Sequence, residues 1–252
     1  MRRLGLLSLL IVLLCGAGTR PRPVPESGGD TFSIKEVFGV SHPNQVIDFD
    51  LTQPIDPTET SLVDDRGVDV AYQVLGGGRK LAVQTDLPAG AERMWTLVRG
   101  RRPQGQSADA VHVRRADRYY EITNALVGVR IVRPGGAWGG TPAPIQGLRM
   151  RDGTWTARGP NILDVRADRA RGPTVRFLEE GPLKVVVEVS YRFDRPAYVY
   201  GQQKVAPAGP GFYTSTVTVE AGEPSILFEE NTDRDLSYSL DVYEAVHPTH
   251  AR

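Results

Sequence analysis

The stretch Glu180-Gly-Pro-Leu-Lys-Val-Val-Val-Glu-Val-Ser-Tyr-Arg-Phe193 indicates the fold class of this chain. Its odd-numbered positions from Leu183 onward are all apolar, whereas its even-numbered positions are mostly polar. A period of two is typical of a β-strand with one buried face and one wetter face. Gly181-Pro182 ends the preceding segment, so the strand is predicted to begin after it. A strand of about eleven residues is long and indicates a large twisted sheet or a sandwich.

The rest of the chain consists of similar short strand-like runs, separated by turn-forming Gly, Pro, Asn and Asp residues. Before residue 99 the runs lie at 32–38, 46–51, 68–75, 81–85 and 94–98. After residue 110 they lie at 119–123, 126–132, 145–150, 161–165, 175–178, 183–193, 197–200, 213–219, 225–229 and 238–243. No long segment carries a helical apolar stripe. Many strands at short spacing favour a sandwich or barrel over a parallel α/β sheet.

The segment 99–110 is polar, contains Gly and has no hydrophobic period, so it is predicted to be a linker between two β units. Its cluster Arg99, Arg101 and Arg102 can attract an anionic partner, but a solvated linker is the favoured interpretation. We therefore predict an all-β protein with an N-terminal barrel-like β domain over 31–98. An antiparallel β-sandwich domain, resembling a supersandwich and incomplete at its C-terminal end, follows over 111–252.

The composition places the chain among soluble globular proteins. Of its 252 residues, 40% are hydrophobic and 24% are charged, and Lys plus Arg equal Asp plus Glu at 30 each. This balance lacks the basic surface expected of a nucleic-acid-binding protein, so no nucleic-acid partner is expected. The 27 Gly and 19 Pro residues fit many strands joined by tight turns.

Residues 1–17 have the pattern of a secretory signal peptide. Arg2 and Arg3 precede an apolar run at 4–14 and the small residues Gly16 and Ala17, where cleavage is expected. The apolar run is shorter than the roughly 20 residues that a membrane span needs. The single cysteine, Cys15, is an alternative lipidation site. The Pro/Gly/Ser-rich segment 18–30 is predicted to be a disordered linker. A secreted or periplasmic protein, with a lipid-anchored variant as the alternative, is the resulting prediction.

Two parts of the sequence resemble a known family. Gly181-Pro182-Leu183 before the long strand, together with the segment 212–230, resembles the central sandwich of exo-rhamnogalacturonan lyase-like proteins. The runs at 68–75, 81–85 and 94–97 resemble the N-terminal RIFT-type barrel of the same family. The resemblance implies an N-terminal barrel, a central sandwich and a C-terminal α/α toroid. Because the sequence carries no toroid, we expect either the N-terminal portion of a larger glycan-degrading enzyme or a relative that lost the toroid. The resemblance implies activity on pectic polysaccharide for the full-length protein.

Two tryptophans are the candidate sugar contacts. Trp138 lies in the Gly-rich segment 134–140, where an exposed indole ring suits stacking on the apolar face of a sugar. Folding of Trp138 back onto the sandwich is the favoured alternative. Trp155 follows the turn-forming residues 151–154, and its strand can direct it to either face. Polysaccharide is therefore the expected partner.

The sequence identifies no catalytic residue. A lyase needs a base beside a uronate and a cation for its carboxylate, and Tyr119, Tyr120, His112 and Arg118 are available for these roles. Nothing in their spacing brings these side chains together, so a structural role is the default for each. No cofactor is expected.

A weak calcium pattern is present near the C-terminal end. Asn231, Asp233 and Asp235 place oxygen atoms at alternate positions, as the first half of a calcium-binding loop does. The expected glycine and closing glutamate are absent, which favours a solvated acidic loop.

Two hypotheses about function follow from the sequence. The first is a secreted carbohydrate-active protein that forms the N-terminal portion of a polysaccharide lyase-like enzyme acting on pectic or other acidic glycan. The second is a non-catalytic secreted β-sandwich that serves as a binding or cell-surface module.

Overall fold

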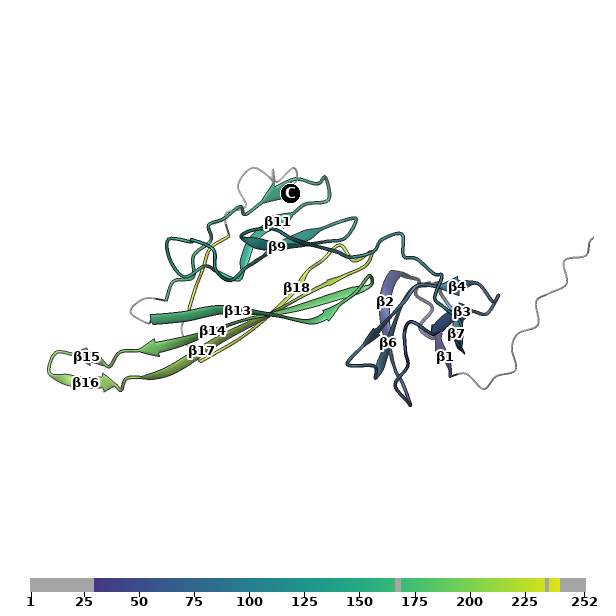
Figure 1. The fold of residues 1–252 in the computed structure, drawn as a ribbon, viewed down its shortest axis with the longest axis horizontal. Helices are drawn as coiled ribbons and strands as arrows, with labels where there is room; N and C mark the ends of the chain where they lie inside the picture. Colours follow the sequence, from purple (N-terminus) through teal and green to yellow (C-terminus); the bar gives the residue numbers. More distant parts are fainter. Residues whose placement is uncertain (1–29, 166–168, 234–235, 241–252) are drawn as a thin grey trace, which may run out of the picture.

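The structure is a computed structural model that describes residues 30–165, 169–233 and 236–240 (Figure 1). Within these ranges every regular element is a β-strand, and the strands pair in antiparallel fashion throughout. The pairing produces five separate sheets. The predicted all-β class is therefore confirmed.

Two small sheets form the N-terminal unit. One sheet has the order β1 (Thr31–Lys35), β7 (Glu92–Arg99), β3 (Thr60–Asp64), β4 (Asp69–Val70). The other has the order β2 (His42–Asp50), β6 (Lys80–Leu87), β5 (Tyr72–Leu75). Both contribute to one apolar cluster that includes Leu62, Leu81 and Trp95. No strand pairing joins the two sheets in the described residues, so the expected barrel-like unit is a pair of open sheets on a shared core.

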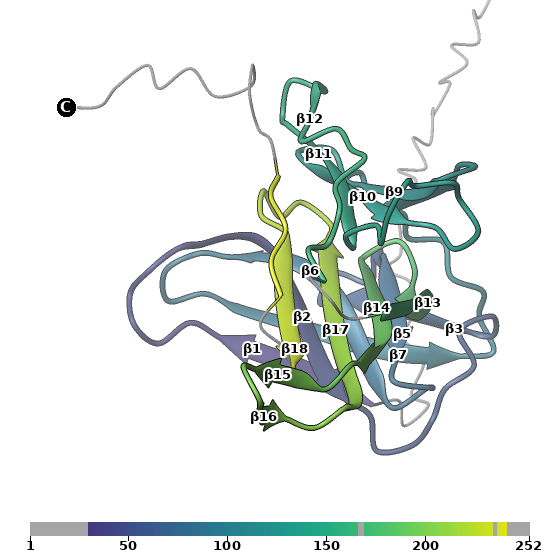
Figure 2. The same cartoon turned by 90° about the vertical axis from the view of Figure 1, so that its left-hand side faces the viewer.

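Two larger sheets form the predicted antiparallel sandwich. One has the order β12 (Trp155–Thr156), β11 (Ile145–Arg149), β10 (Gly128–Val132), β9 (Tyr119–Thr123), β8 (His112–Arg115). The other has the order β13 (Arg169–Glu180), β14 (Lys184–Arg195), β17 (Gly209–Glu220), β18 (Leu227–Thr232). Figures 1 and 2 show the first sheet lying over the second. A hairpin of β15 (Tyr198–Tyr200) and β16 (Gln203–Ala206) extends away from the N-terminal unit (Figure 1).

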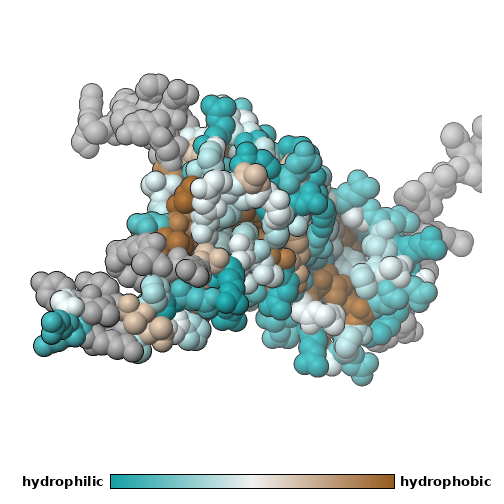
Figure 3. All heavy atoms as spheres, turned by 60° about the vertical axis from the view of Figure 1, so that its left-hand side comes forward, coloured by the Kyte–Doolittle hydropathy of each residue, from teal (hydrophilic) through white to brown (hydrophobic). Residues whose placement is uncertain are grey.

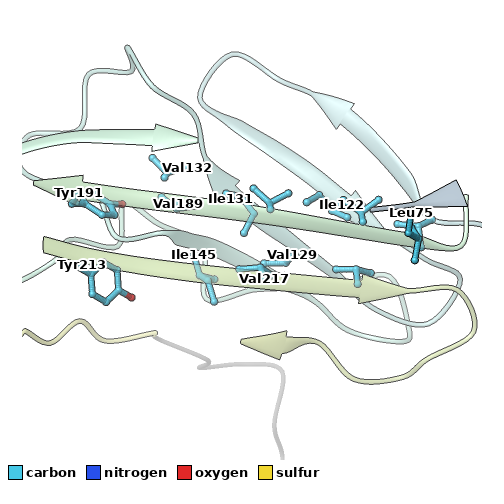
Figure 4. Close-up of a cluster of buried hydrophobic side chains, with 14 of the residues drawn as sticks. Leu75, Ile122, Val129, Ile131, Val132, Ile145, Val189, Tyr191, Tyr213 and Val217 are labelled. Carbon is cyan, nitrogen blue, oxygen red and sulfur yellow. The ribbon is translucent and has the colours of Figure 1, made fainter. Parts of the chain in front are cut away.

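The long strand identified in the sequence is the centre of the sandwich core. On β14 the side chains Val185, Val187, Val189, Tyr191 and Phe193 are at most 1% exposed. Figure 4 shows two of them facing side chains from the opposite sheet. Burial of each such side chain contributes roughly 1.5–3 kcal/mol. Hydrophilic side chains cover most of the surface seen in Figure 3, and the hydrophobic ones form narrow strips.

The segment predicted to be a linker is packed against the N-terminal sheets. Arg101 forms an ion pair with Asp69 at 2.5 Å, and the Ser107 hydroxyl donates to Gln84 Oε1 at 2.7 Å. A Cβ added to Gly105 would lie 2.3 Å from a backbone carbon of β4. These contacts hold the segment 99–110 against the N-terminal unit. The division of the chain into two domains at 99–110 stays a prediction.

The Gln73 side chain, 7% exposed, joins the N-terminal unit to the sandwich. Its Oε1 accepts from the backbone N–H groups of Leu183 and Lys184 at 2.9 and 2.8 Å. Its Nε2 donates to the Lys184 carbonyl at 2.9 Å. The side-chain amide therefore pairs with the start of β14 as a neighbouring strand would. A Cβ added to Gly181 would lie 2.3 Å from Gln73 Cδ, so only glycine leaves room for this amide.

Replacement of Gln73 by leucine is expected to lower the free energy of unfolding by about 3 kcal/mol, because three backbone groups lose their partners in a buried place. Urea denaturation measures the change. Gln53→Ala, at an exposed position, is the control and should change stability by less than about 0.5 kcal/mol. Equal effects of the two substitutions would contradict this role of Gln73.

Replacement of Gly181 by alanine is expected to destabilise the protein by displacing the Gln73 amide. Its effect should therefore not add to that of Gln73→Leu, because both changes remove the same hydrogen bonds. A double-mutant cycle in urea tests this coupling. Additive effects of the two substitutions would show that Gly181 acts independently of Gln73.

Candidate functional site

The outer face of the five-stranded sheet carries two rows of side chains that run across the strands. Residues on β9 alternate in direction, so Ile122 enters the core and its neighbours Glu121 and Thr123 face outward. The first row, here called the charged row, is formed by cross-strand partners on β8 to β11: Arg114, Glu121, Arg130 and Gly147. The second, the pocket row, continues to β12: His112, Thr123, Gly128, Arg149 and Trp155.

Glu121 is the centre of the charged row, and its side chain is only 9% exposed. Its Oε1 accepts from Arg130 Nε at 2.9 Å and lies 2.8 Å from Arg130 Nη2. Its Oε2 accepts from Arg114 Nε at 2.7 Å and also contacts Arg114 Nη2. Both carboxylate oxygens thus receive charged donors from two neighbouring strands. Hydrogen bonds between charged groups are shorter and roughly twice as strong as those between neutral groups.

Arg130 is held between two aromatic rings. Its guanidinium carbon lies 4.6 Å from the centre of the Tyr119 ring and 4.1 Å from that of Trp155. The attraction of a cation to the face of an aromatic ring stabilises this arrangement. A Cβ on Gly147 would lie 3.1 Å from Arg130 Cδ, so the glycine lets the arginine lie flat on the sheet. The Arg130 side chain is consequently only 16% exposed.

A concave pocket of about 390 Å³ lies over the pocket row. Its lining includes His112 on β8, Thr123 on β9, Arg149 on β11 and Trp155 on β12. Arg149 Nη1 donates to the Asn124 carbonyl at 3.3 Å. The pocket therefore combines one indole ring, one imidazole and one guanidinium with the Glu121 carboxylate and small polar side chains, which are the groups that bind a polar ring-shaped ligand.

Thr154 and Arg149 both lower the pKa of Asp152, which lies in the turn before β12. The pKa of Asp152 lies below its ordinary value, mainly because the backbone and side chain of Thr154 hydrogen-bond to the carboxylate. The positive charge of Arg149 lowers this pKa further. No carboxylate in the described part of the chain lies within ion-pair distance of Arg149.

The structure places the two candidate tryptophans in different environments. Trp155 lines the pocket, as its predicted role requires. Trp138 packs partly buried against the sandwich core, and the guanidinium carbon of Arg118 lies 4.3 Å from its ring centre. Its indole N–H is buried without a hydrogen-bond partner among the described residues. These contacts match the folded-back alternative for Trp138. The sugar-binding role of either tryptophan stays a prediction.

The other residues considered from the sequence are separated. Tyr120 faces the core side of β9, where its ring makes an edge contact with Phe177 at 5.1 Å. Arg118 covers Trp138, whereas Tyr119 and His112 lie on the outer face. The structure therefore does not bring these four side chains together as one catalytic group.

The predicted calcium ligands are only partly described. Asp233 Oδ1 accepts from the Phe212 backbone N–H at 2.8 Å, and Asn231 lies exposed on β18. Asp235 and the lipidation candidate Cys15 lie outside the described residues. In the described ranges, no three His, Cys, Asp or Glu side chains gather closely enough to hold a metal ion. The same ranges contain no helix long and apolar enough to cross a membrane.

Comparison with known proteins identifies a shared fold and no family. No protein-family model matches the chain, and no curated protein matches it. The solved structures that match include a protein in glycosyl hydrolase family 38 from Enterococcus faecalis, at TM-score 0.51 and 12% identity. They also include an α-mannosidase from Enterococcus faecalis V583, at TM-score 0.49 and 10% identity. Each match covers 82% of this chain but only 32% and 30% of those chains, respectively. The first likeness shows the fold alone.

Replacement of Trp138 by alanine is expected to lower the free energy of unfolding by about 2 kcal/mol, because it removes a large side chain packed on the core. Thermal or urea unfolding measures the loss. Glycan binding, where it is detected, should remain within about twofold of wild type at temperatures where the variant is folded. Unchanged stability with lost glycan affinity would instead assign Trp138 to the ligand.

Proposed function

We propose that this protein is a secreted carbohydrate-active protein, the N-terminal portion of a larger enzyme that acts on pectic or other acidic glycan. The outer face of the five-stranded sheet is where this part of the enzyme contacts the glycan. The observation that carries the proposal is the pocket in which Trp155 and Arg149 lie side by side on neighbouring strands. An indole face stacks on the C–H face of a sugar, and a guanidinium binds its carboxylate in bidentate geometry.

Two further observations support a carbohydrate ligand. The sequence resembles exo-rhamnogalacturonan lyase-like proteins in both β units, and polysaccharide lyase activity on rhamnogalacturonan is what that resemblance implies. One of the solved structures with a similar fold is described as a glycosyl hydrolase family 38 protein. This chain spans 32% of the length of that protein. The signal-peptide pattern at 1–17 supports secretion or export to the periplasm.

A non-catalytic binding or cell-surface module is the second candidate, and the engagement of the charged row favours it. Glu121 is committed to two ion pairs, and both faces of Arg130 are covered by rings. These groups hold the shape of the surface and are poorly placed to exchange protons with a ligand. A face of this kind binds glycan equally well with or without a catalytic domain elsewhere.

A panel of polygalacturonate, rhamnogalacturonan and neutral galactan tests the proposal with the full chain in isothermal titration calorimetry. We expect binding to the acidic glycans and a loss of at least about tenfold in affinity for Trp155→Ala, which corresponds to about 1.4 kcal/mol. The melting temperature of the variant reports whether it is folded. Release of unsaturated uronate, followed by ultraviolet absorbance, separates the enzyme from the binding module.

The matched control is Phe38→Ala, which removes an aromatic side chain that is 84% exposed in the N-terminal unit. It should leave glycan affinity unchanged. Failure of the wild-type protein to bind any acidic or neutral glycan in the panel would overturn the proposed function. Equal loss of glycan affinity in Trp155→Ala and Phe38→Ala would show that the glycan does not bind specifically at the outer face of the five-stranded sheet.

A further inference from the structure

The arginines of the outer face differ in how far a ligand can reach them. Arg130 presents two of its nitrogens to Glu121 and has a ring against each face of its guanidinium. Arg114 is 67% exposed, but it also directs two nitrogens to Glu121. Without Glu121 these two guanidiniums would present a doubly positive surface next to the pocket. With Glu121 their charge is partly neutralised, and the Nε and Nη2 atoms of each guanidinium are directed at the carboxylate.

Arg149 differs from Arg114 and Arg130 in that it has no carboxylate partner in the described part of the chain. One of its nitrogens donates to a backbone carbonyl, and the others have no hydrogen-bond partner in the described part of the chain. Its cross-strand neighbour on one side is Trp155 and on the other is Gly128, which has no side chain to cover it. A ligand in the pocket therefore meets the Arg149 guanidinium beside the Trp155 indole, with the Glu121 carboxylate in the same lining.

We propose that Glu121 sets the charge selectivity of this face, so that the pocket accepts one carboxylate-bearing sugar unit at Arg149 and disfavours densely sulfated chains. This inference rests on the proposed function and specifies the glycan that the site takes. A uronate has one planar carboxylate, which matches one guanidinium fork. A polysulfated chain gains affinity mainly from several accessible cations and long-range attraction. Glu121 reduces both contributions.

The pocket also supplies what a single sugar ring needs besides its charge. The side chains of His112 and Thr123 line the same pocket and have no hydrogen-bond partner among the described residues, so they can contact sugar hydroxyls. The guanidinium carbon of Arg130 lies 4.1 Å from the centre of the Trp155 ring, so Arg130 packs against the indole. Glu121 therefore acts as a positioning residue as well, because it holds the arginine on which Trp155 rests.

The first experiment compares ligands on the wild-type full chain by calorimetry. Oligogalacturonate, its methyl ester and dextran sulfate are titrated at low and high salt. We expect the acid to bind at least about tenfold more tightly than the ester, and dextran sulfate to bind more weakly than the acid. Equal affinity for acid and ester would overturn the inference while leaving glycan binding intact. Absence of binding to every glycan would overturn the proposed function instead.

The second experiment uses two substitutions in the site. Glu121→Gln is expected to raise affinity for dextran sulfate at least about tenfold and to make it more dependent on salt. Arg149→Gln is expected to remove the preference for oligogalacturonate over its methyl ester. Unlike Glu121→Gln, it should not raise the affinity for dextran sulfate. Glu188→Gln is the matched control, since Glu188 pairs with Arg176 at 3.2 Å on the other sheet. It should change no glycan affinity.

Unchanged selectivity in a folded Glu121→Gln protein would overturn the role of Glu121. Circular dichroism and thermal unfolding establish whether that variant is folded. If the Glu121→Gln variant is not folded, the ligand series on the wild-type protein and the Arg149→Gln variant test the charge selectivity instead. Neither of them requires removal of a buried carboxylate. Tighter binding of dextran sulfate than of oligogalacturonate to the wild-type protein contradicts the inference directly.

Discussion

The arrangement of the two β units depends on side chains that satisfy backbone groups at their boundary, and the buried Gln73 amide at the start of β14 makes the most of these bonds. Gln84 Nε2 also donates to the Ala221 carbonyl at 3.1 Å, and Glu179 accepts from the Gly76 N–H at 2.7 Å. Backbone groups at the end of a sheet must find partners or remain in water. Here a side chain supplies them, so the N-terminal unit approaches the sandwich without sharing a sheet with it. Gly181 is part of the same constraint, because any side chain there would displace the amide. The start of the central strand is therefore determined by a residue about a hundred positions earlier.

The outer face follows from the packing of the inner one. Side chains of β9, β10 and β11 that fill the core impose the direction of their neighbours, since successive residues point to opposite faces. Ile122, Val129 and Leu148 pack inward, so Glu121, Arg130 and Arg149 are turned outward. A slip of one residue in register would exchange these sets and bury three charges. The hydrophobic core thus positions the charged row and the pocket row without any contact to a ligand.

Sequence reasoning located most of the strands, though not β3 or β8, but it did not predict which of their residues meet across the sheet, for a physical reason. The alternation in 119–123 and 126–132 is local, so it identifies β9 and β10 and the residues that share a face. Which strands are neighbours, and in which register, depends on contacts across the sheet that no local pattern contains. Glu121 therefore could not be matched with Arg114 and Arg130 in advance. Trp155 was considered from the sequence because it is an indole after a tight turn, although its face was left open, whereas Arg149 resembled any other arginine of the chain.

The charged row is difficult to explain as a contribution to stability. Desolvation of Glu121 and Arg130 offsets most of their attraction, and well-packed apolar residues of similar volume commonly give equal or greater stability. A row of that apolar kind would also keep the sheet intact. What apolar residues cannot do is hold a guanidinium against Trp155 and also pair with a second arginine. The cost of burying Glu121 and Arg130 is therefore better accounted for by the shape and charge that they give to the face around the pocket than by the stability of the fold.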